Sequence, residues 1–126
     1  ETSGTGPTFS PNSATWAHGT STVVLAFPLT GLRDGERITQ WNWFGRKTSI
    51  AGTITARLFK IALVTGTTTQ VGADQTNGAN NPGDISLGQS GLTESVVSGF
   101  TYFIQITPGG TITDTTYGAD YTADRP

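Results

Sequence analysis

Residues 28–64, PLTGLRDGERITQWNWFGRKTSIAGTITARLFKIALV, decide the fold. Asp34-Gly35 is a strong turn dipeptide, because glycine has no Cβ that would clash at positive φ. The residues after it are rich in β-branched and aromatic side chains, so a strand is predicted to start near Glu36 or Arg37. A polar loop then leads to a second strand at residues 53–64. These two strands are expected to lie at the centre of an antiparallel sheet.

The alternation along the first strand raises a question of register. One face of a regular strand would carry Ile38, Gln40, Asn42 and Phe44, and the other Thr39, Trp41 and Trp43. Because Gln and Asn are poor core residues and Trp is usually buried, we expect a β-bulge after Ile38 that places it in the core with both Trp residues. The alternative is a regular strand with the two Trp rings side by side at the surface.

The second strand has apolar residues on both of its faces. Ile54, Ala56 and Leu58 mark one face, whereas Phe59, Ile61 and Leu63 mark the opposite one. A sandwich covers only one face of each sheet, so the other face needs a cover from the N-terminal tail, a loop or a second subunit. We favour a subunit, which makes Phe59, Ile61 and Leu63 the candidate oligomer interface.

The rest of the chain predicts short strands joined by tight turns. Residues 1–15 are mostly Thr, Ser, Gly, Pro and Asn and are interpreted as a tail or linker, either an inert extension or an arm that reaches a neighbour. Residues 72–91 are interpreted as a long loop with at most a short strand at 84–87. Further strands are predicted at residues 21–27, which are either buried on both sides or part of a sandwich and end at Pro28, and at 67–71, 92–97, 100–107 and 111–122.

These elements predict the fold class. Seven or eight strands at this spacing are typical of an all-β antiparallel β-sandwich or jelly roll. Residues 16–126 are expected to form a single domain, since 126 residues suffice for one core.

The composition indicates a nearly neutral surface. The chain has 17 Gly, 6 Pro and 13% charged residues, with a formal net charge of −2. A surface without clustered Lys and Arg does not attract phosphate backbones, so nucleic acid is not expected as a partner. No apolar run is long enough for a membrane helix, so no membrane partner is expected.

Cys and Met are both absent. Their absence excludes disulfides and thiolate chemistry and removes the side chains most easily oxidised, which suits an extracellular location. No signal peptide is visible, and the chain begins with Glu, so we expect a processed chain or an excised segment.

No set of residues indicates catalysis. A nucleophilic triad would need His18, the single histidine, and a surface histidine in a Gly/Thr/Ser segment is the simpler interpretation. Zinc needs three converging ligands, which one His and no Cys hardly provide. Glycoside hydrolysis would need a pair of carboxylates, and most of those present lie in turns: Asp34, Glu36, Asp74, Asp84, Glu94, Asp114, Asp120 and Asp124. We expect neither enzymatic activity nor a cofactor.

Residues 73–84 leave calcium open as an alternative to a plain turn-rich loop, because several side-chain oxygens lie close together between glycines. The spacing lacks the bidentate Glu at the twelfth position of an EF-hand. No metal is the expectation that we keep.

Aromatic side chains on an amide-rich neutral surface suit sugars, whose apolar faces stack on rings while their hydroxyls bond to polar groups. Core burial is the simpler interpretation for each ring taken singly. The candidate glycan-binding residues are Trp16, Trp41, Trp43, Phe103 and Tyr117, with Tyr121 as a further one.

Four segments resemble a recurring β-sandwich domain of bacteriophage virion proteins: PLTGLRDGERITQWNW, GTITARLFKIAL, GLTESVVSGFTYFIQIT and TYGADY. The resemblance covers about residues 21–121, rests on turn and core positions, and transfers no catalytic residue. It implies a head fibre, capsid decoration or tail-fibre module that acts by assembly and adhesion. The positions that carry it are Gly35, Ile38, Ala56, Leu58, Val96, Gly99, Tyr102, and Tyr117 or Tyr121.

The expected function is therefore that of a non-enzymatic virion surface module, located on the virion or otherwise outside the cell. It would form a homo-oligomer, with a trimer favoured, contact other virion proteins, and have adhesion to host glycans as an additional role. The alternative is a carbohydrate-binding module from a secreted protein, which exposed Trp41 and Trp43 would favour. A hydrolase has the least support.

Overall fold

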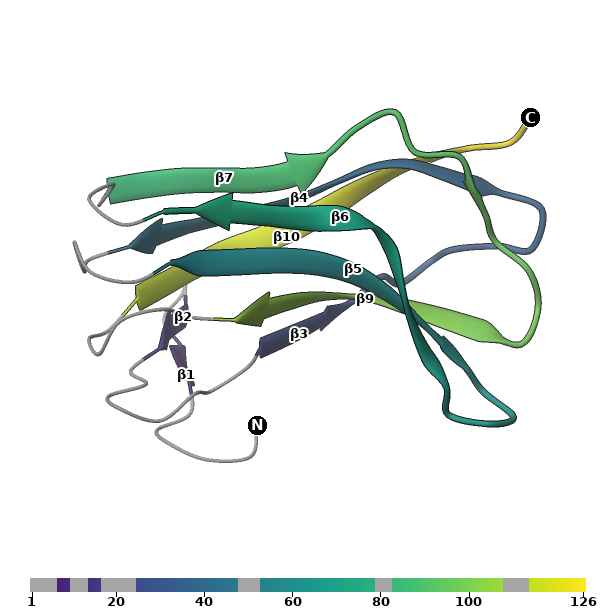
Figure 1. The fold of residues 1–126 in the computed structure, drawn as a ribbon, viewed down its shortest axis with the longest axis horizontal. Helices are drawn as coiled ribbons and strands as arrows, with labels where there is room; N and C mark the ends of the chain where they lie inside the picture. Colours follow the sequence, from purple (N-terminus) through teal and green to yellow (C-terminus); the bar gives the residue numbers. More distant parts are fainter. Residues whose placement is uncertain (1–6, 10–13, 17–24, 48–52, 79–82, 108–113) are drawn as a thin grey trace.

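The computed structural model describes residues 7–9, 14–16, 25–47, 53–78, 83–107 and 114–126. These residues form ten strands in two layered antiparallel sheets, and β5 and β6 cross in front of β4 and β10 in Figure 1. No helix long enough and apolar enough to span a membrane is found in these residues. The strands are β1 (Pro7–Phe9), β2 (Ala14–Trp16), β3 (Leu25–Pro28), β4 (Arg37–Lys47), β5 (Ile54–Ala62), β6 (Thr68–Asn77), β7 (Gly83–Gln89), β8 (Glu94–Ser95), β9 (Phe100–Thr107) and β10 (Asp114–Asp124).

The strand order is that of a jelly roll. Sheet A has the order β1-β2-β10-β4-β7, with β8 also paired to β4, and sheet B has the order β3-β9-β5-β6. The pairs β2·β10, β3·β9, β4·β7 and β5·β6 are those of a strip of eight strands folded in half, which then rolls into two sheets. The predicted all-β antiparallel sandwich is confirmed, and β1 and β8 are short additions to these eight strands.

The core lies between the inward residues of the two sheets. Ile54, Ala56 and Leu58 of β5 are fully buried, as are Ile104 and Ile106 of β9. Sheet A supplies Ile38, Trp41 and Trp43, also fully buried. Because every second residue of these strands faces inward, the neighbouring residues are left on two outer faces.

The bulge predicted in β4 is confirmed. Thr122 of β10 pairs with Gln40 and the next residue, Ala123, pairs with Ile38, so Thr39 is the extra residue on β4. One extra residue reverses the alternation, which lets Ile38 face the core together with Trp41 and Trp43.

The turn predicted at Asp34-Gly35 is also confirmed. The N–H of Glu36 donates to the carbonyl of Arg33 at 3.1 Å, and Gly35 has φ of +89°. The Asp34 carboxylate accepts the N–H of Ser98 at 3.0 Å, so this turn is tied to the one before β9. Strand β4 then starts at Arg37, as predicted.

Three sequence predictions are wrong in part. The tail predicted at residues 1–15 contributes β1 and most of β2 to sheet A, because β2 pairs through its backbone with β10, and β1 pairs in turn with β2. For the strand predicted at residues 21–27, burial on both sides is wrong because Ala26 of β3 is exposed, whereas its place within a sandwich is confirmed. The strand predicted at residues 92–97 is reduced to the two residues of β8. Residues 21–24 lie outside the described residues.

The long loop predicted at residues 72–91 is also wrong, because β6 and β7 occupy most of it. The pairing of β6 with β5 shifts between Val71 and Gln75, which marks a bulge. Gly72 fits this bulge with φ of +81°, and a Cβ there would lie only 2.3 Å from Oε1 of Gln89. That same oxygen accepts the N–H of Ala73 at 3.0 Å, so the bulge is bonded to β7.

Candidate functional site

Sheet B has an apolar outer face, formed by Ala26, Pro28, Phe59, Ile61 and Phe103. These residues alternate with buried ones on β3, β5 and β9, so their side chains point away from the core. The rings of Phe59 and Phe103 are stacked, with centroids 5.5 Å apart and planes 20° apart. This apolar face carries two of the three predicted interface residues, Phe59 and Ile61.

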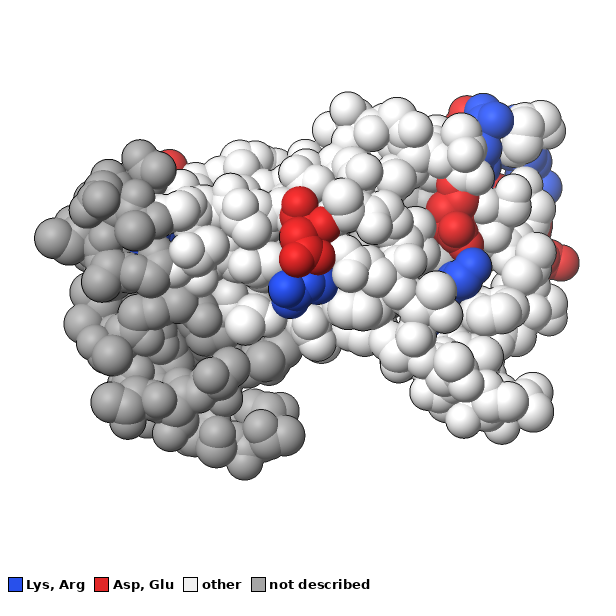
Figure 2. Space-filling model, in the orientation of Figure 1, with Lys and Arg blue, Asp and Glu red and all other residues white. Residues whose placement is uncertain are grey.

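A shallow depression of about 320 Å³ lies in the apolar face, lined in part by Ala26, Pro28, Ile61 and Phe103. The charges nearby are compensated within the chain. Arg57 of β5 donates to Asp74 of β6 at 2.8 Å, and Figure 2 shows one acidic and one basic group meeting over the middle of these strands. The face is thus apolar at one end and neutral at the other.

The third predicted interface residue, Leu63, lies elsewhere. Strand β5 ends at Ala62, and Leu63 is 64% exposed in the turn to β6, next to Val64 at 94%. This hairpin tip projects from the body of the domain in Figure 1. The predicted strand was two residues too long because Gly66, at φ of +73°, turns the chain and donates its N–H to Ala62.

Sheet A has a polar outer face with an exposed aromatic residue at one end. Tyr117, 47% exposed, is the extra residue of a bulge in β10, since Thr116 pairs with Gly45 and Gly118 pairs with Phe44. Its hydroxyl donates to Asp84 of β7 at 2.8 Å, and Arg46 of β4 donates to the same carboxylate oxygen at 3.0 Å. This tyrosine cluster of Tyr117, Asp84 and Arg46 joins three strands.

The bulge is fixed from inside the sandwich. The preceding residue, Thr116, is buried, and its Oγ1 accepts the indole N–H of Trp43 at 2.7 Å. Thr116 therefore faces inward and Tyr117 faces outward at a set position.

Amide and carboxylate groups continue along the same face. Asn42 donates to Asp120 of β10 at 2.9 Å, and its Oδ1 faces the side-chain amide of Gln40 at 3.4 Å. Between this pair and the tyrosine cluster lies Phe44, which is 36% exposed. Opposite Asn42 on β7 stands Gly88, where a Cβ would lie 2.6 Å from Oδ1 of Asn42.

Hydrogen bonds favour the ionised form of one carboxylate on each outer face, Asp84 on sheet A and Asp74 on sheet B. Hydrogen bonds from Tyr117 and Arg46 lower the pKa of Asp84, and the same contact with Asp84 raises the pKa of Tyr117. Hydrogen bonds from Arg57 and Gln70 lower the pKa of Asp74.

Trp41 and Trp43 cannot serve as sugar platforms in this fold. Both are fully buried, because the bulge at Thr39 directs them inward. Trp16 pairs through its backbone with Pro7 and Asp114, and its side chain lies outside the description. His18 lies outside the described residues. Of the predicted glycan residues, Phe103 belongs to the apolar face of sheet B and Tyr117 to the outer face of sheet A.

The calcium alternative at residues 73–84 loses its carboxylate pair. Asp74 bonds Arg57 on the outer face of sheet B, whereas Asp84 bonds Arg46 on the outer face of sheet A. The two carboxylates therefore lie on opposite sides of the sandwich. In the part of the chain that the structure describes, no three His, Asp or Glu residues are grouped as a metal site would require.

One polar cluster lies at the end of the core. Lys60 Nζ donates to Glu94 at 3.0 Å, and the hydroxyl of Tyr102 donates to the same oxygen at 2.8 Å. Burial and the neighbouring Glu94 raise the pKa of Tyr102. Because Lys60 and Tyr102 both bond Glu94, the cluster holds β8 against β5 and β9.

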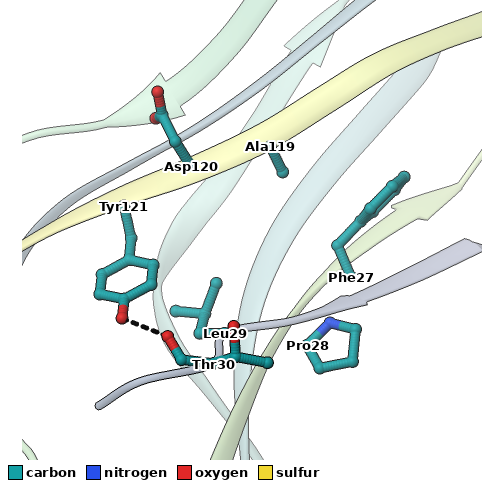
Figure 3. A pocket seen from close by; sticks show the side chains of 7 residues that line it. All are labelled: Phe27, Pro28, Leu29, Thr30, Ala119, Asp120 and Tyr121. Carbon is teal, nitrogen blue, oxygen red and sulfur yellow. Dashed lines mark hydrogen bonds between the residues drawn. The ribbon is translucent and has the colours of Figure 1, made fainter. Parts of the chain in front are cut away.

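A lateral cleft of about 340 Å³ lies between the end of β3 and β10. Figure 3 shows the hydroxyl of Tyr121 bonded to the carbonyl oxygen of Thr30 across one side of it. The side chain of Asp120 is turned away from Phe27 and Pro28. The Asp120 carboxylate, which accepts a hydrogen bond from Asn42, is the single carboxylate among the lining residues, so the cleft holds no carboxylate pair.

Comparisons of the chain with protein-family models, with curated proteins and with solved structures give no match. The functional argument therefore rests on the two outer faces. Sequence reasoning did not group Asn42, Phe44, Arg46 and Asp84 as one surface. The first three alternate with Trp43 and Gly45 along β4, so this alternation could have placed them on one face.

Proposed function

We propose that the chain is a non-enzymatic structural module of a virion surface, a head fibre, capsid decoration or tail-fibre domain, that acts by assembling into a homo-trimer. The apolar face of sheet B is the subunit contact in this proposal. The single observation that carries it is the stacked pair of Phe59 and Phe103 on an outward face.

The chemistry of this face fits a second copy of the same chain. Removing apolar side chains from water lowers the free energy by roughly 25 cal/mol per Å² of buried area. The ion pair of Arg57 and Asp74 is compensated within each subunit, so two copies brought together meet no net charge. Leu63 at the projecting hairpin tip supplies a second apolar contact in this arrangement.

The virion assignment is supported by the resemblance of four segments to phage virion domains and agrees with the jelly-roll order, which viral capsid domains also use. Fold alone does not assign function, because lectin domains share this fold. The burial of Trp41 and Trp43 removes the feature that would have favoured a carbohydrate-binding module built on those two rings.

Light scattering after size-exclusion chromatography tests the assembly. We expect a mass about three times the 13.2 kDa of the chain, stable on dilution. The double variant Phe59→Ser/Phe103→Ser should run as a folded monomer, since both rings point outward. Phe44→Ser, on the other sheet, is the matched control and should remain trimeric.

A wild-type chain that stays monomeric at high concentration would overturn the assembly proposal. The virion assignment has a separate test, in which purified virus particles from the source culture are labelled with gold-conjugated antibody against this chain. Labelled capsids or fibres are expected, and particles without label would contradict the assignment.

A further inference from the structure

The outer face of sheet A is built differently from that of sheet B, and it is not used by the assembly proposed above. We propose that it is a binding site for a neutral glycan chain, with Tyr117 as the stacking residue and Asn42 and Asp120 as the groups that bond sugar hydroxyls. This inference does not depend on the oligomeric state of the protein.

The aromatic component is held before any ligand arrives. Tyr117 bonds Asp84 two strands away, so its ring spans the outer side of β4 and stays exposed by 47%. The buried bond from Trp43 to Thr116 fixes the backbone on which it stands. A rigid ring that is apolar in its body and polar at its tip supplies contact area at little cost in conformational entropy.

The polar component lies within reach along the same strands. Phe44 of β4 pairs with Gly118, the residue next to Tyr117. Asn42 lies two residues from Phe44 on the same strand, a distance of about 7 Å. Asn42 and Asp120 bond each other and keep free lone pairs and a second amide N–H. Adjacent hydroxyls of a sugar, each both a donor and an acceptor, complement such a pair.

Asn42 packs closely over the neighbouring strand β7. Gly88 occupies the facing position on β7, and any side chain there would collide with Asn42 and the backbone of Trp41. Asn42 is therefore held close to the sheet, and the partly exposed ring of Phe44 lies between it and Tyr117 as a further apolar surface for a sugar ring.

The balance of charge selects a neutral ligand. Two cations, Arg37 and Arg46, stand on this face, and both are bonded to carboxylates, Asp124 and Asp84. Asp120 adds a further negative charge without a cationic partner among the bonds described. Among the described residues of this face, both arginines are paired, so an anionic glycan finds no unpaired arginine, whereas neutral hexoses can use the hydrogen-bonding groups and rings.

Native affinity electrophoresis tests the site, with gels that contain dextran, mannan, a mixed-linkage β-glucan or a galactan, and one control gel with dextran sulfate. We expect the wild-type protein to be retarded in at least one neutral gel. Tyr117→Ala should weaken the apparent association by about tenfold or more. Tyr117→Phe, which keeps the ring, and Asn42→Ala should each weaken it less.

The control variant is Phe59→Ser on the opposite face. Relative to its own mobility in a gel without polysaccharide, it should be retarded as strongly as the wild-type protein. Unchanged retardation of folded Tyr117→Ala and Asn42→Ala would overturn the site. Retardation in none of the four neutral gels, or only in dextran sulfate, would overturn the proposed ligand class. Failure here would leave the light-scattering result intact, so the two proposals fail separately.

Discussion

The outer faces of the two sheets differ although their inner faces are alike. Inward, both sheets present fully buried aliphatic or aromatic residues, such as Leu58 and Trp43. Outward, sheet B presents stacked phenyl rings, Phe59 and Phe103, whereas sheet A presents amides, carboxylates and the phenol of Tyr117. The strands that carry these residues are paired antiparallel in both sheets, so backbone pairing does not account for the difference between the two outer faces.

This contrast teaches where the information about function lies. Inward positions are constrained by packing and would be apolar in any sandwich. Outward positions are free to be polar, so stacked apolar rings on the outer face of sheet B need an explanation, and assembly is the one that we propose. An aromatic ring fixed among amides on the other face needs a different reason, which a sugar supplies.

The largest effect is expected from a change that removes the core common to both faces. Trp43→Ala should lower the free energy of unfolding by about 3–5 kcal/mol, because it leaves a cavity between the sheets. The neighbouring change Phe44→Ala, at a position 36% exposed, should cost about 1 kcal/mol or less. Urea denaturation followed by far-ultraviolet circular dichroism measures both.

A larger loss for Phe44→Ala than for Trp43→Ala would mean that Phe44 is buried and Trp43 exposed, as in a regular strand without the bulge. The assignment of Asn42, Phe44 and Arg46 to one outer face would then fail, and the glycan site would fail with it.

A smaller effect is expected where the core holds the outer face of sheet A. Thr116→Val keeps the shape of the side chain but leaves the buried N–H of Trp43 without its partner, which should cost about 1–3 kcal/mol. Thr116→Ser keeps the hydroxyl and should cost less. Chemical denaturation gives the free energies, and the indole N–H signal of Trp43 in NMR spectra reports the bond. A Val variant as stable as the wild type would show that the bulge at Tyr117 is not held by this bond.

A still smaller effect is expected within the apolar face. The stacked rings of Phe59 and Phe103 should show a coupling free energy of about 0.5–1.5 kcal/mol in a double-mutant cycle to Ala. The cycle should be measured by urea denaturation over a range of protein concentrations, so that the concentration-dependent contribution of assembly can be subtracted. A coupling near zero there would mean that the rings are brought together only by a neighbouring subunit.

Much of the fold was predictable because period-two patterns are local. The turn at Asp34-Gly35, the inward set of β9 and the bulge in β4 all follow from the chemistry of neighbouring residues. Strand β1 and the part of β6 after Val71 were missed because Thr, Gln and Gly carry little apolar signal. The bulge at Gly72 that lets β6 continue depends on Gln89, which no local pattern reveals.

The site was predictable only in part, for the same reason. The second apolar face of β5 could be read from Phe59 and Ile61, but its partner Phe103 comes from β9. Tyr117 was identified as a candidate glycan-binding residue, but Asp84 and Arg46, which form its cluster, lie 33 and 71 residues before it in the chain. Which side each Trp faced was settled by a single bulge.

The smallest effect concerns acid and tests whether the two faces are electrostatically independent. Asp84 on sheet A and Asp74 on sheet B both have pKa values lowered from 3.8, the first chiefly by the bond from Tyr117 and the second chiefly by the bond from Arg57. A carboxyl with a lower pKa in the folded state stabilises the fold fully above 3.8, and this contribution is lost as the pH falls through the folded pKa. Both pairs are exposed, so the loss should be modest.

Tyr117→Phe separates the two groups, because it removes the largest cause of the shift at Asp84 and leaves Asp74 untouched. Carboxyl NMR titration of the variant should show the pKa of Asp84 rising toward 3.8 while that of Asp74 stays where it was. If both values moved together, the faces would communicate through the core, and the glycan and assembly surfaces could not be varied one at a time. If neither moved, the bond from Tyr117 to Asp84 would not persist in solution, and the ring would lose the anchor that makes it a fixed platform.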